Sequence, residues 1–181
     1  MKALVVCEAR GGVALDSAFE LLEVASRLGA EPVMVLVGPA GAVPAAAGRL
    51  LLAEVERAES YDPGLHRNAV LEAVRREEPD VVLLPHSSYG WDLAPRIAAA
   101  LRAAQVSELV ALAEGGGLEV ACCNGKMRRV VQPATPRVVV TVQPGAFPAG
   151  GARGGPPSIE RIEAAPGAPG VEYLGHEAPS A

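Results

Sequence analysis

The chain has 181 residues and a formal net charge of −5, and half of its residues are hydrophobic. This length and composition allow one domain with a substantial core and exclude a disordered chain. Without a long basic run, the chain is not expected to bind nucleic acid. It also lacks the roughly 18–20 continuous apolar residues that span a bilayer, and its N-terminal apolar run is too short for a secretory signal. We therefore expect a soluble, cytoplasmic protein with no membrane partner.

The first half of the chain alternates two apolar patterns, as expected of strands and helices that follow one another. Short apolar runs predict buried parallel strands at residues 3–7, 32–37, 50–56 and 80–85. Apolar residues at helical spacing predict helices over residues 17–28, 62–79 and about 92–102. This alternation predicts a doubly wound α/β fold, in which a mainly parallel sheet carries helices on both faces.

Local signals indicate where the helices begin and which way they face. Ser17 can cap the first helix, with Glu20 at the reciprocal capping-box position. Pro95 is expected in the first turn of the third helix, where its missing N–H costs nothing. His66 is expected on the polar, solvated face of the second helix.

The pattern changes after about residue 105, where short β-rich runs are separated by turn sequences. We expect antiparallel strands near residues 107–113, 117–123, 127–132 and 137–143. Gly115–Gly117 and Asn124-Gly125 are typical of hairpin turns. The predicted organisation is one α/β domain at 1–143, a mobile Gly/Pro-rich linker at 144–157, and two edge strands with a tail at 158–181.

The three cysteines are Cys7, Cys122 and Cys123. Neighbouring residues of a strand point to opposite faces, so the adjacent pair is a poor metal site and an unlikely disulfide. Their spacing fits no zinc motif. We expect small buried hydrophobic side chains and no bound metal.

A candidate ligand site lies where the first and fourth predicted strands end. In a doubly wound sheet, ligands bind at the carboxyl ends of the strands where the winding direction reverses. The helix that follows the fourth strand offers free N–H groups, which favour an anion. The candidate anion or nucleotide crevice comprises Glu8, Arg10, His86, Ser87, Ser88, Gly90 and Asp92.

A structural interpretation of the same residues stays open. Ser87, Ser88 and Asp92 can cap the helix, and the Asp92 carboxylate repels an anion. His86 has no Ser–His–acid arrangement in view, and the chain has no P-loop, so we expect no catalytic residue and no enzyme activity. The basic run at 126–129 predicts a solvated edge strand or, alternatively, a docking surface for an acidic partner.

Several segments resemble one family. The sequence YGWDLAPRIAAAL is similar to the Gly-x-Asp-Leu-Ala-Pro-Arg segment that opens a helix in the N-terminal domain of the electron transfer flavoprotein alpha subunit. PDVVLLPHSS resembles the strand and loop before that helix. CNGKMRRVVQPATPRVVVTVQPGAFP resembles that family's hairpin, and the first 29 residues resemble its opening strand, loop and helix. The resemblance covers nearly the whole chain in order.

The resemblance implies an αβ heterodimer that carries electrons from dehydrogenases to an acceptor, using FAD. In this family a second domain of the alpha subunit holds most of the FAD, and its Gly-Arg-Gly motif has no counterpart here. We therefore expect a component that docks a beta-type subunit, or a separate flavin-domain protein, without holding FAD firmly itself. The expected partner contacts are Tyr89, Trp91, Arg96, Lys126 and Arg128.

The chain departs from the family in two places, and two other functions stay open. Asn124 stands where the family usually has Gly, and Gln143 stands where it usually has Arg. Because the related beta subunit holds AMP in the equivalent domain, a stand-alone module that binds or senses AMP or ATP is one alternative. A homodimeric assembly domain, formed through the β-rich second half, is the other.

Overall fold

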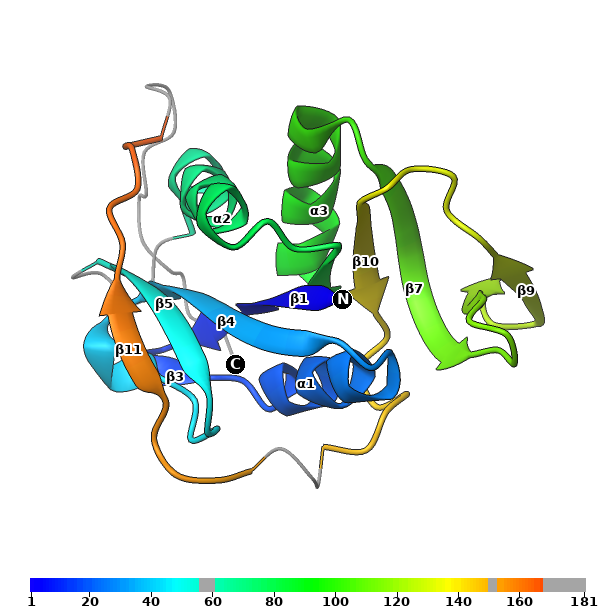
Figure 1. Ribbon diagram of the computed structural model, residues 1–181, viewed down its shortest axis with the longest axis horizontal. Coiled ribbons are helices and arrows are strands. Elements are labelled where there is room, and N and C mark those ends of the chain that lie inside the picture. Colours follow the sequence, from blue (N-terminus) through cyan, green and yellow to red (C-terminus); the bar gives the residue numbers. More distant parts are fainter. Residues whose placement is uncertain (56–60, 150–152, 168–181) are drawn as a thin grey trace, which may run out of the picture.

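A nine-stranded sheet forms the middle layer of the molecule (Figure 1). The computed structural model describes residues 1–55, 61–149 and 153–167. Neighbouring strands run parallel from β11 to β7, and β8 and β9 continue the sheet antiparallel. The strands in sheet order are β11 (Ser158–Arg161), β5 (Arg49–Glu54), β4 (Glu31–Gly38), β1 (Lys2–Cys7), β6 (Val81–Pro85), β10 (Val138–Val142), β7 (Ala104–Leu112), β8 (Leu118–Cys122) and β9 (Met127–Val131).

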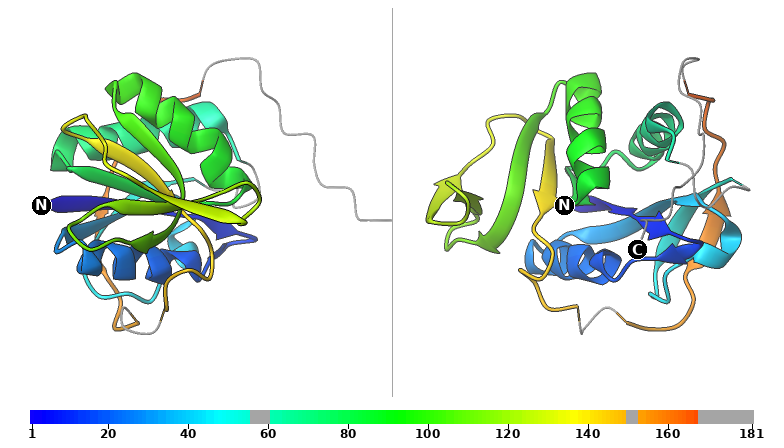
Figure 2. Two further views of the ribbon diagram at one scale, coloured as in Figure 1. Left: turned by 90° about the vertical axis from the view of Figure 1, so that its right-hand side faces the viewer. Right: turned by 180° about the vertical axis from the view of Figure 1, so that it is seen from behind.

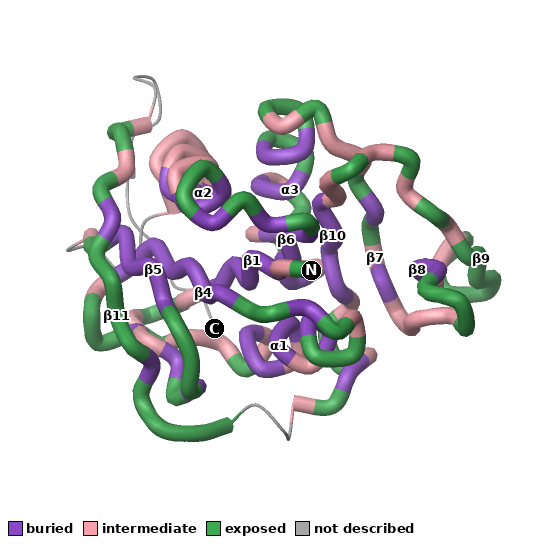
Figure 3. The backbone as a smooth tube through the Cα atoms, in the orientation of Figure 1, coloured by how far each residue is buried: buried purple, intermediate pink, exposed green. Residues whose placement is uncertain are grey.

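Helices cover both faces of this sheet, so the predicted doubly wound α/β class is confirmed. Helix α1 lies on one face and α2 and α3 lie on the other, as Figure 1 and the left view of Figure 2 both show. The buried backbone concentrates in the central strands and on the inner sides of the helices (Figure 3). The remaining bounds are α1 (Ser17–Arg27), α2 (Pro63–Glu77), α3 (Ser88–Leu101), the 3₁₀ turn η1 (Ala40–Ala42), and the hairpin strands β2 (Ala9–Arg10) and β3 (Val13–Ala14).

The core is built mainly from Ala, Val and Leu, as two apolar clusters on opposite faces of the sheet. Successive residues of a buried parallel strand point to opposite faces, so each central strand supplies both clusters. In β1, for example, Val5 packs with α1, whereas Leu4 and Val6 pack with α2 and α3. None of the helices in the described ranges is both long enough and apolar enough to cross a membrane.

Strand β10 corrects the sequence prediction. The run at 137–143 was expected to be antiparallel, but β10 returns to the middle of the sheet and pairs in parallel with β6 and β7. Val139, Val140 and Val142 are buried, as is typical of a central parallel strand. The three preceding β-rich segments do pair antiparallel, in the order β7, β8 and β9, as predicted. Their hairpins extend away from the three-layer body (Figure 1).

The helix starts also differ from expectation. Asp16, not Ser17, occupies the N-cap of α1, and the buried Ser17 hydroxyl has no hydrogen-bond partner among the described residues. Glu20 accepts a hydrogen bond from the Gly145 N–H (2.7 Å) rather than completing a capping box. Helix α3 begins at Ser88, four residues earlier than expected, which places Pro95 in the helix interior. There its ring removes the N–H that would bond the Trp91 carbonyl.

The segment after β10 crosses the α1 side of the molecule and leads to β11. Phe147 is buried, and the Arg153 guanidinium lies 4.4 Å from the centre of the Phe19 ring. Arg153 also pairs with Asp16 at 2.8 Å. Strand β11, at SIER, lies at one edge of the sheet beside β5, whereas the second expected strand, GVEYLGHE, lies outside the described residues. The mobility of 144–157 stays a prediction.

Candidate functional site

The winding direction reverses between β1 and β6, which are neighbours in the sheet, with Ala3 opposite Val81. Their carboxyl ends bring Glu8 next to Ser87, although the two residues are far apart in sequence. The Ser87 hydroxyl donates a 2.6 Å hydrogen bond to Glu8 Oε2. The Arg10 guanidinium donates to Glu8 Oε1 at 3.1 Å. The structure thus unites three of the predicted crevice residues around one carboxylate.

Glu8 is only 4% exposed, and its carboxylate group is buried at the start of α3, where it accepts the hydrogen bond from Ser87. Ser87 is the N-cap of that helix, and its hydroxyl oxygen also accepts from the Gly90 N–H at 3.4 Å. An anion near a helix N-terminus is stabilised by the free N–H groups. The chain therefore supplies its own negative charge at the place where the sequence suggested a ligand anion.

Gly90 lets α3 start directly against the end of β6. A β-carbon at this position would lie 1.8 Å from the Pro85 carbonyl oxygen, closer than any side chain can approach. Only glycine fits this contact. Ser88, the first residue of α3, is exposed beside it and makes no side-chain hydrogen bond within the described ranges.

His86 is held at the junction of β6, β10 and β7. Its Nδ1 atom lies 2.8 Å from the hydroxyl of the buried Thr141, which in turn accepts from the Glu108 N–H at 3.1 Å. Burial lowers the pKa of His86, although the nearby Glu108 charge opposes this shift. The Trp91 ring packs edge-on with its centre 5.3 Å from that of His86. These contacts fix the imidazole in place, and the hydroxyl among them belongs to the buried Thr141.

Asp92 belongs to a separate cluster, so the structure does not bring all seven crevice residues together. The Tyr61 hydroxyl donates to Asp92 Oδ2 at 2.8 Å, and Arg96 donates to the same carboxylate at 2.8 and 3.1 Å. The hydrogen bonds from Arg96 hold the pKa of Asp92 below its usual value. Burial and the bond to Asp92 raise the pKa of Tyr61.

His66 corrects another prediction, because it is buried rather than solvated. It is 8% exposed and packs with Tyr61 and Tyr89 at ring-centre distances of 4.8 and 5.6 Å. Burial lowers its pKa, although its Nδ1 contact with the Asp62 carbonyl opposes the shift. The sequence held a usable signal: His66 precedes Val70 and Ala73 at helical spacing, on the stripe that faces the core.

The five expected partner contacts form two separate groups. Trp91 and Arg96 lie on α3, with Trp91 62% exposed and Arg96 paired to Asp92. Tyr89, also on α3, is partly buried within the aromatic cluster. Lys126 and Arg128 belong to the hairpin that ends in β9, and β10, β7 and β8 separate β9 from β6 in the sheet (Figure 3).

The cysteines divide by environment. Cys7 is fully buried, and burial raises the pKa of its thiol to about 12, so it is an unreactive core residue as expected. Cys123 is exposed, against expectation, because the strand ends at Cys122 and the turn begins there. Across the part of the chain that the structure describes, no group of three or more metal-ligand side chains occurs.

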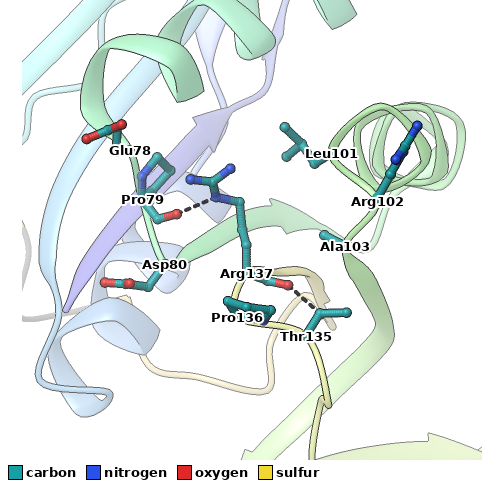
Figure 4. A pocket seen from close by; sticks show the side chains of 9 residues that line it. All are labelled: Glu78, Pro79, Asp80, Leu101, Arg102, Ala103, Thr135, Pro136 and Arg137. Carbon is teal, nitrogen blue, oxygen red and sulfur yellow. Dashed lines mark hydrogen bonds between the residues drawn. The ribbon is translucent and has the colours of Figure 1, made fainter.

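Two surface hollows lie away from this crevice. One, with a volume of about 290 Å³, opens at the amino ends of β6 and β10 (Figure 4). Arg137 lies in it, with its Nε donating to the Pro79 carbonyl at 2.7 Å, beside the acidic Glu78 and Asp80. The other, of about 510 Å³, lies between the ends of β5 and β11 and the start of α2. Neither hollow was suggested by the sequence.

Comparison with known proteins decides the family. A model of the electron transfer flavoprotein domain matches residues 3–167. The chain belongs to the electron transfer flavoprotein domain family. The electron transfer flavoprotein subunit alpha of Bacillus subtilis (strain 168) is similar to this chain, with 27% identity over 101 residues. That match covers 54% of this chain and 31% of the relative, so the chain spans less than a third of the relative's length. The predicted resemblance to the N-terminal domain of an alpha subunit is confirmed.

The residues at the winding reversal are a poor fit for the FAD associated with this electron transfer flavoprotein family. Its diphosphate would face the buried Glu8 carboxylate, which already receives the Ser87 and Arg10 donors. The backbone of Gly90 packs directly against Pro85, so the start of α3 and the end of β6 leave no gap there for a diphosphate. Like charges in a buried site repel strongly, because the local dielectric constant is low.

Proposed function

We propose that this chain acts as an alpha-type electron transfer flavoprotein component that docks a beta-type subunit or a separate flavin-domain protein. In this role the described residues contribute to electron transfer by binding the partner polypeptide. They do not catalyse a reaction, and FAD is held mainly by other polypeptide. The family membership supports this role. We also propose that the component works in the cytoplasm.

One observation carries the proposal. The site that most often binds ligands in this fold is filled by the chain's own Glu8, Ser87 and Arg10, whereas α3 and β9 present exposed side chains. Trp91 is 62% exposed on α3, and Arg96 and Arg128 are exposed too. Trp and Arg are enriched among the residues that dominate binding energy at interfaces.

Co-expression with a beta-type subunit tests this role. We expect the two chains to co-purify, the complex to carry flavin absorbance, and the chain purified alone to be colourless. The variant Trp91→Ala should weaken co-purification. The control variant Arg75→Ala, which changes an exposed arginine on α2, should not. Flavin at near one equivalent in the lone chain would contradict the proposal.

The nucleotide alternative is favoured by one feature, the start of α3 beside Arg10, whose side chain is 70% exposed. Calorimetry with AMP and ATP separates it from docking, since binding that Ser87→Ala abolishes would favour a nucleotide module. Light scattering tests the homodimer, because a monomer at high protein concentration would count against it.

A further inference from the structure

We infer that the outer edge of β9 accepts an extended acidic segment of a partner protein as a tenth strand of the sheet. This inference rests on the proposed docking role and specifies the chemistry of one contact surface. The surface consists of Lys126 and the residues of β9, Met127–Val131. It lies at the end of the hairpins that extend from the body (Figures 1 and 2).

Strand β9 has a free edge. Among the described strands it pairs only with β8, so its outer backbone N–H and C=O groups have no strand partner. Met127 to Val130 are all exposed, and Met127 and Val130 are 59% and 57% exposed. Such an edge is a template for another strand, and natural proteins usually protect or use it.

The opposite edge of the sheet provides a contrast. On β11, Glu160 pairs with Arg76 at 2.8 Å and Arg161 pairs with Glu54 at 2.8 Å. Both charged side chains of that strand are thus satisfied by α2 and β5. At the β9 edge, Arg128 pairs with Glu119 at 2.9 Å, whereas Arg129 and Lys126, which directly precedes β9, form no ion pair within the described ranges. The β9 edge therefore keeps positive charge for a partner.

The same charges disfavour a second copy of this chain as the occupant. Two β9 strands paired antiparallel about Arg129 would place the two Arg129 side chains opposite each other. Centring the pair on Arg128, or between Arg128 and Arg129, again places guanidinium groups opposite each other. Like charges directly opposite each other across strands are destabilising. An acidic partner strand would instead place carboxylates opposite these guanidinium groups, so that opposite charges attract.

The register of β9 specifies the partner's pattern. Arg128 and Val130 share the face that carries Glu119 and Ala121 of β8, whereas Met127 and Arg129 lie on the other face. A strand added antiparallel would favour acidic residues opposite the two arginines. It would favour apolar residues opposite Met127, Val130 and the partly buried Val131. Read from its N-terminus, the partner segment is apolar, apolar, acidic, acidic, apolar.

A labelled peptide with the core Val-Ile-Glu-Glu-Val, flanked by threonines, tests the inference on the full chain. We expect fluorescence anisotropy to show binding, and amide NMR shifts to concentrate on β8 and β9. Reversing both charges, as Arg128→Glu with Arg129→Glu, should weaken binding at least tenfold. The matched control Arg75→Glu should leave it unchanged, and circular dichroism checks that each variant is folded.

A second peptide, N-methylated at alternate amides, tests whether a strand forms, because methylation removes the backbone donors. It should lose binding while keeping its charge. Equal binding of the methylated peptide, equal binding of a lysine-for-glutamate peptide, or shifts centred on other elements would overturn the inference. So would dimerisation of the chain through β9. Co-purification with a beta-type subunit without peptide binding would refute this edge contact while leaving the docking role intact.

Discussion

The contact between Gly90 and the end of β6 gives the sharpest test of the crevice. A β-carbon at position 90 would lie 1.8 Å from the Pro85 carbonyl oxygen and 3.0 Å from its carbonyl carbon. Because both atoms belong to the backbone of a buried strand end, neither can move aside easily. Overpacking costs about 1–3 kcal/mol or more, whereas alanine gains up to about 1 kcal/mol over glycine within a helix. We therefore expect Gly90→Ala to lower the free energy of unfolding by about 2 kcal/mol, or Tm by about 4–8 °C.

Urea unfolding followed by circular dichroism measures this change. Gly41→Ala is the matched control, because a β-carbon at Gly41 meets nothing within 4 Å. We expect that control to change the free energy of unfolding by less than about 0.5 kcal/mol. If Gly90→Ala were as stable as the parent chain, α3 could not approach β6 this closely, and the crevice geometry described above would be wrong.

Three other predictions test the buried Glu8 side chain, the buried His66 ring, and the contact that Arg153 makes in the segment after β10. Glu8→Gln removes the buried charge but keeps an acceptor for Ser87, so calorimetry should show phosphate binding at least about tenfold tighter than in the parent chain. Burial lowers the folded-state pKa of His66 below its unfolded value of about 6.5. Between these two pKa values the unfolded chain binds more protons than the folded chain. The free energy of unfolding should therefore fall as the pH drops from about 7 to 5. His66→Phe removes the titrating ring and should make this pH dependence weaker. Arg153→Ala removes the contact with the Phe19 ring and should cost about 0.5 kcal/mol, with faster limited proteolysis of the segment after β10 as the readout; an unchanged digestion rate would argue against that contact.

The sequence predicted the features that depend on local pattern. The strand and helix alternation and the hairpin turns follow from periodicity and turn residues. The site at the winding reversal was inferred instead from the general rule for doubly wound sheets. The position of β10 could not be predicted in this way. Its run of valines suits an antiparallel hairpin as well as a central parallel strand, and only pairing with the distant β6 decides between them.

The predicted start of α3 near Asp92 was wrong for a different reason. Proline is common in the first turn of a helix, so Pro95 suggested a start near Asp92. In the structure the Ser87 cap and the close approach of Gly90 fix the start earlier, and tertiary packing tolerates the proline inside the helix. The bond between Glu8 and Ser87 was equally hidden, because the sequence does not show whether two polar residues contact a ligand or each other.

The crevice at the winding reversal, which Glu8 and Ser87 occupy, and the unpaired edge of β9 both favour a docking function over a ligand-binding one. A ligand anion at the winding reversal would have to displace the Ser87 hydrogen bond to a buried carboxylate, and breaking such a bond costs about 1.5–3 kcal/mol before any contact is gained. A strand added to β9 breaks no described hydrogen bond, because its outer backbone groups have no strand partner within the described ranges. The free-energy cost of association is therefore lower at the sheet edge than at the crevice. If Glu8→Gln failed to admit phosphate while the β9 charge reversal still abolished peptide binding, the edge would account for recognition without any ligand at the winding reversal.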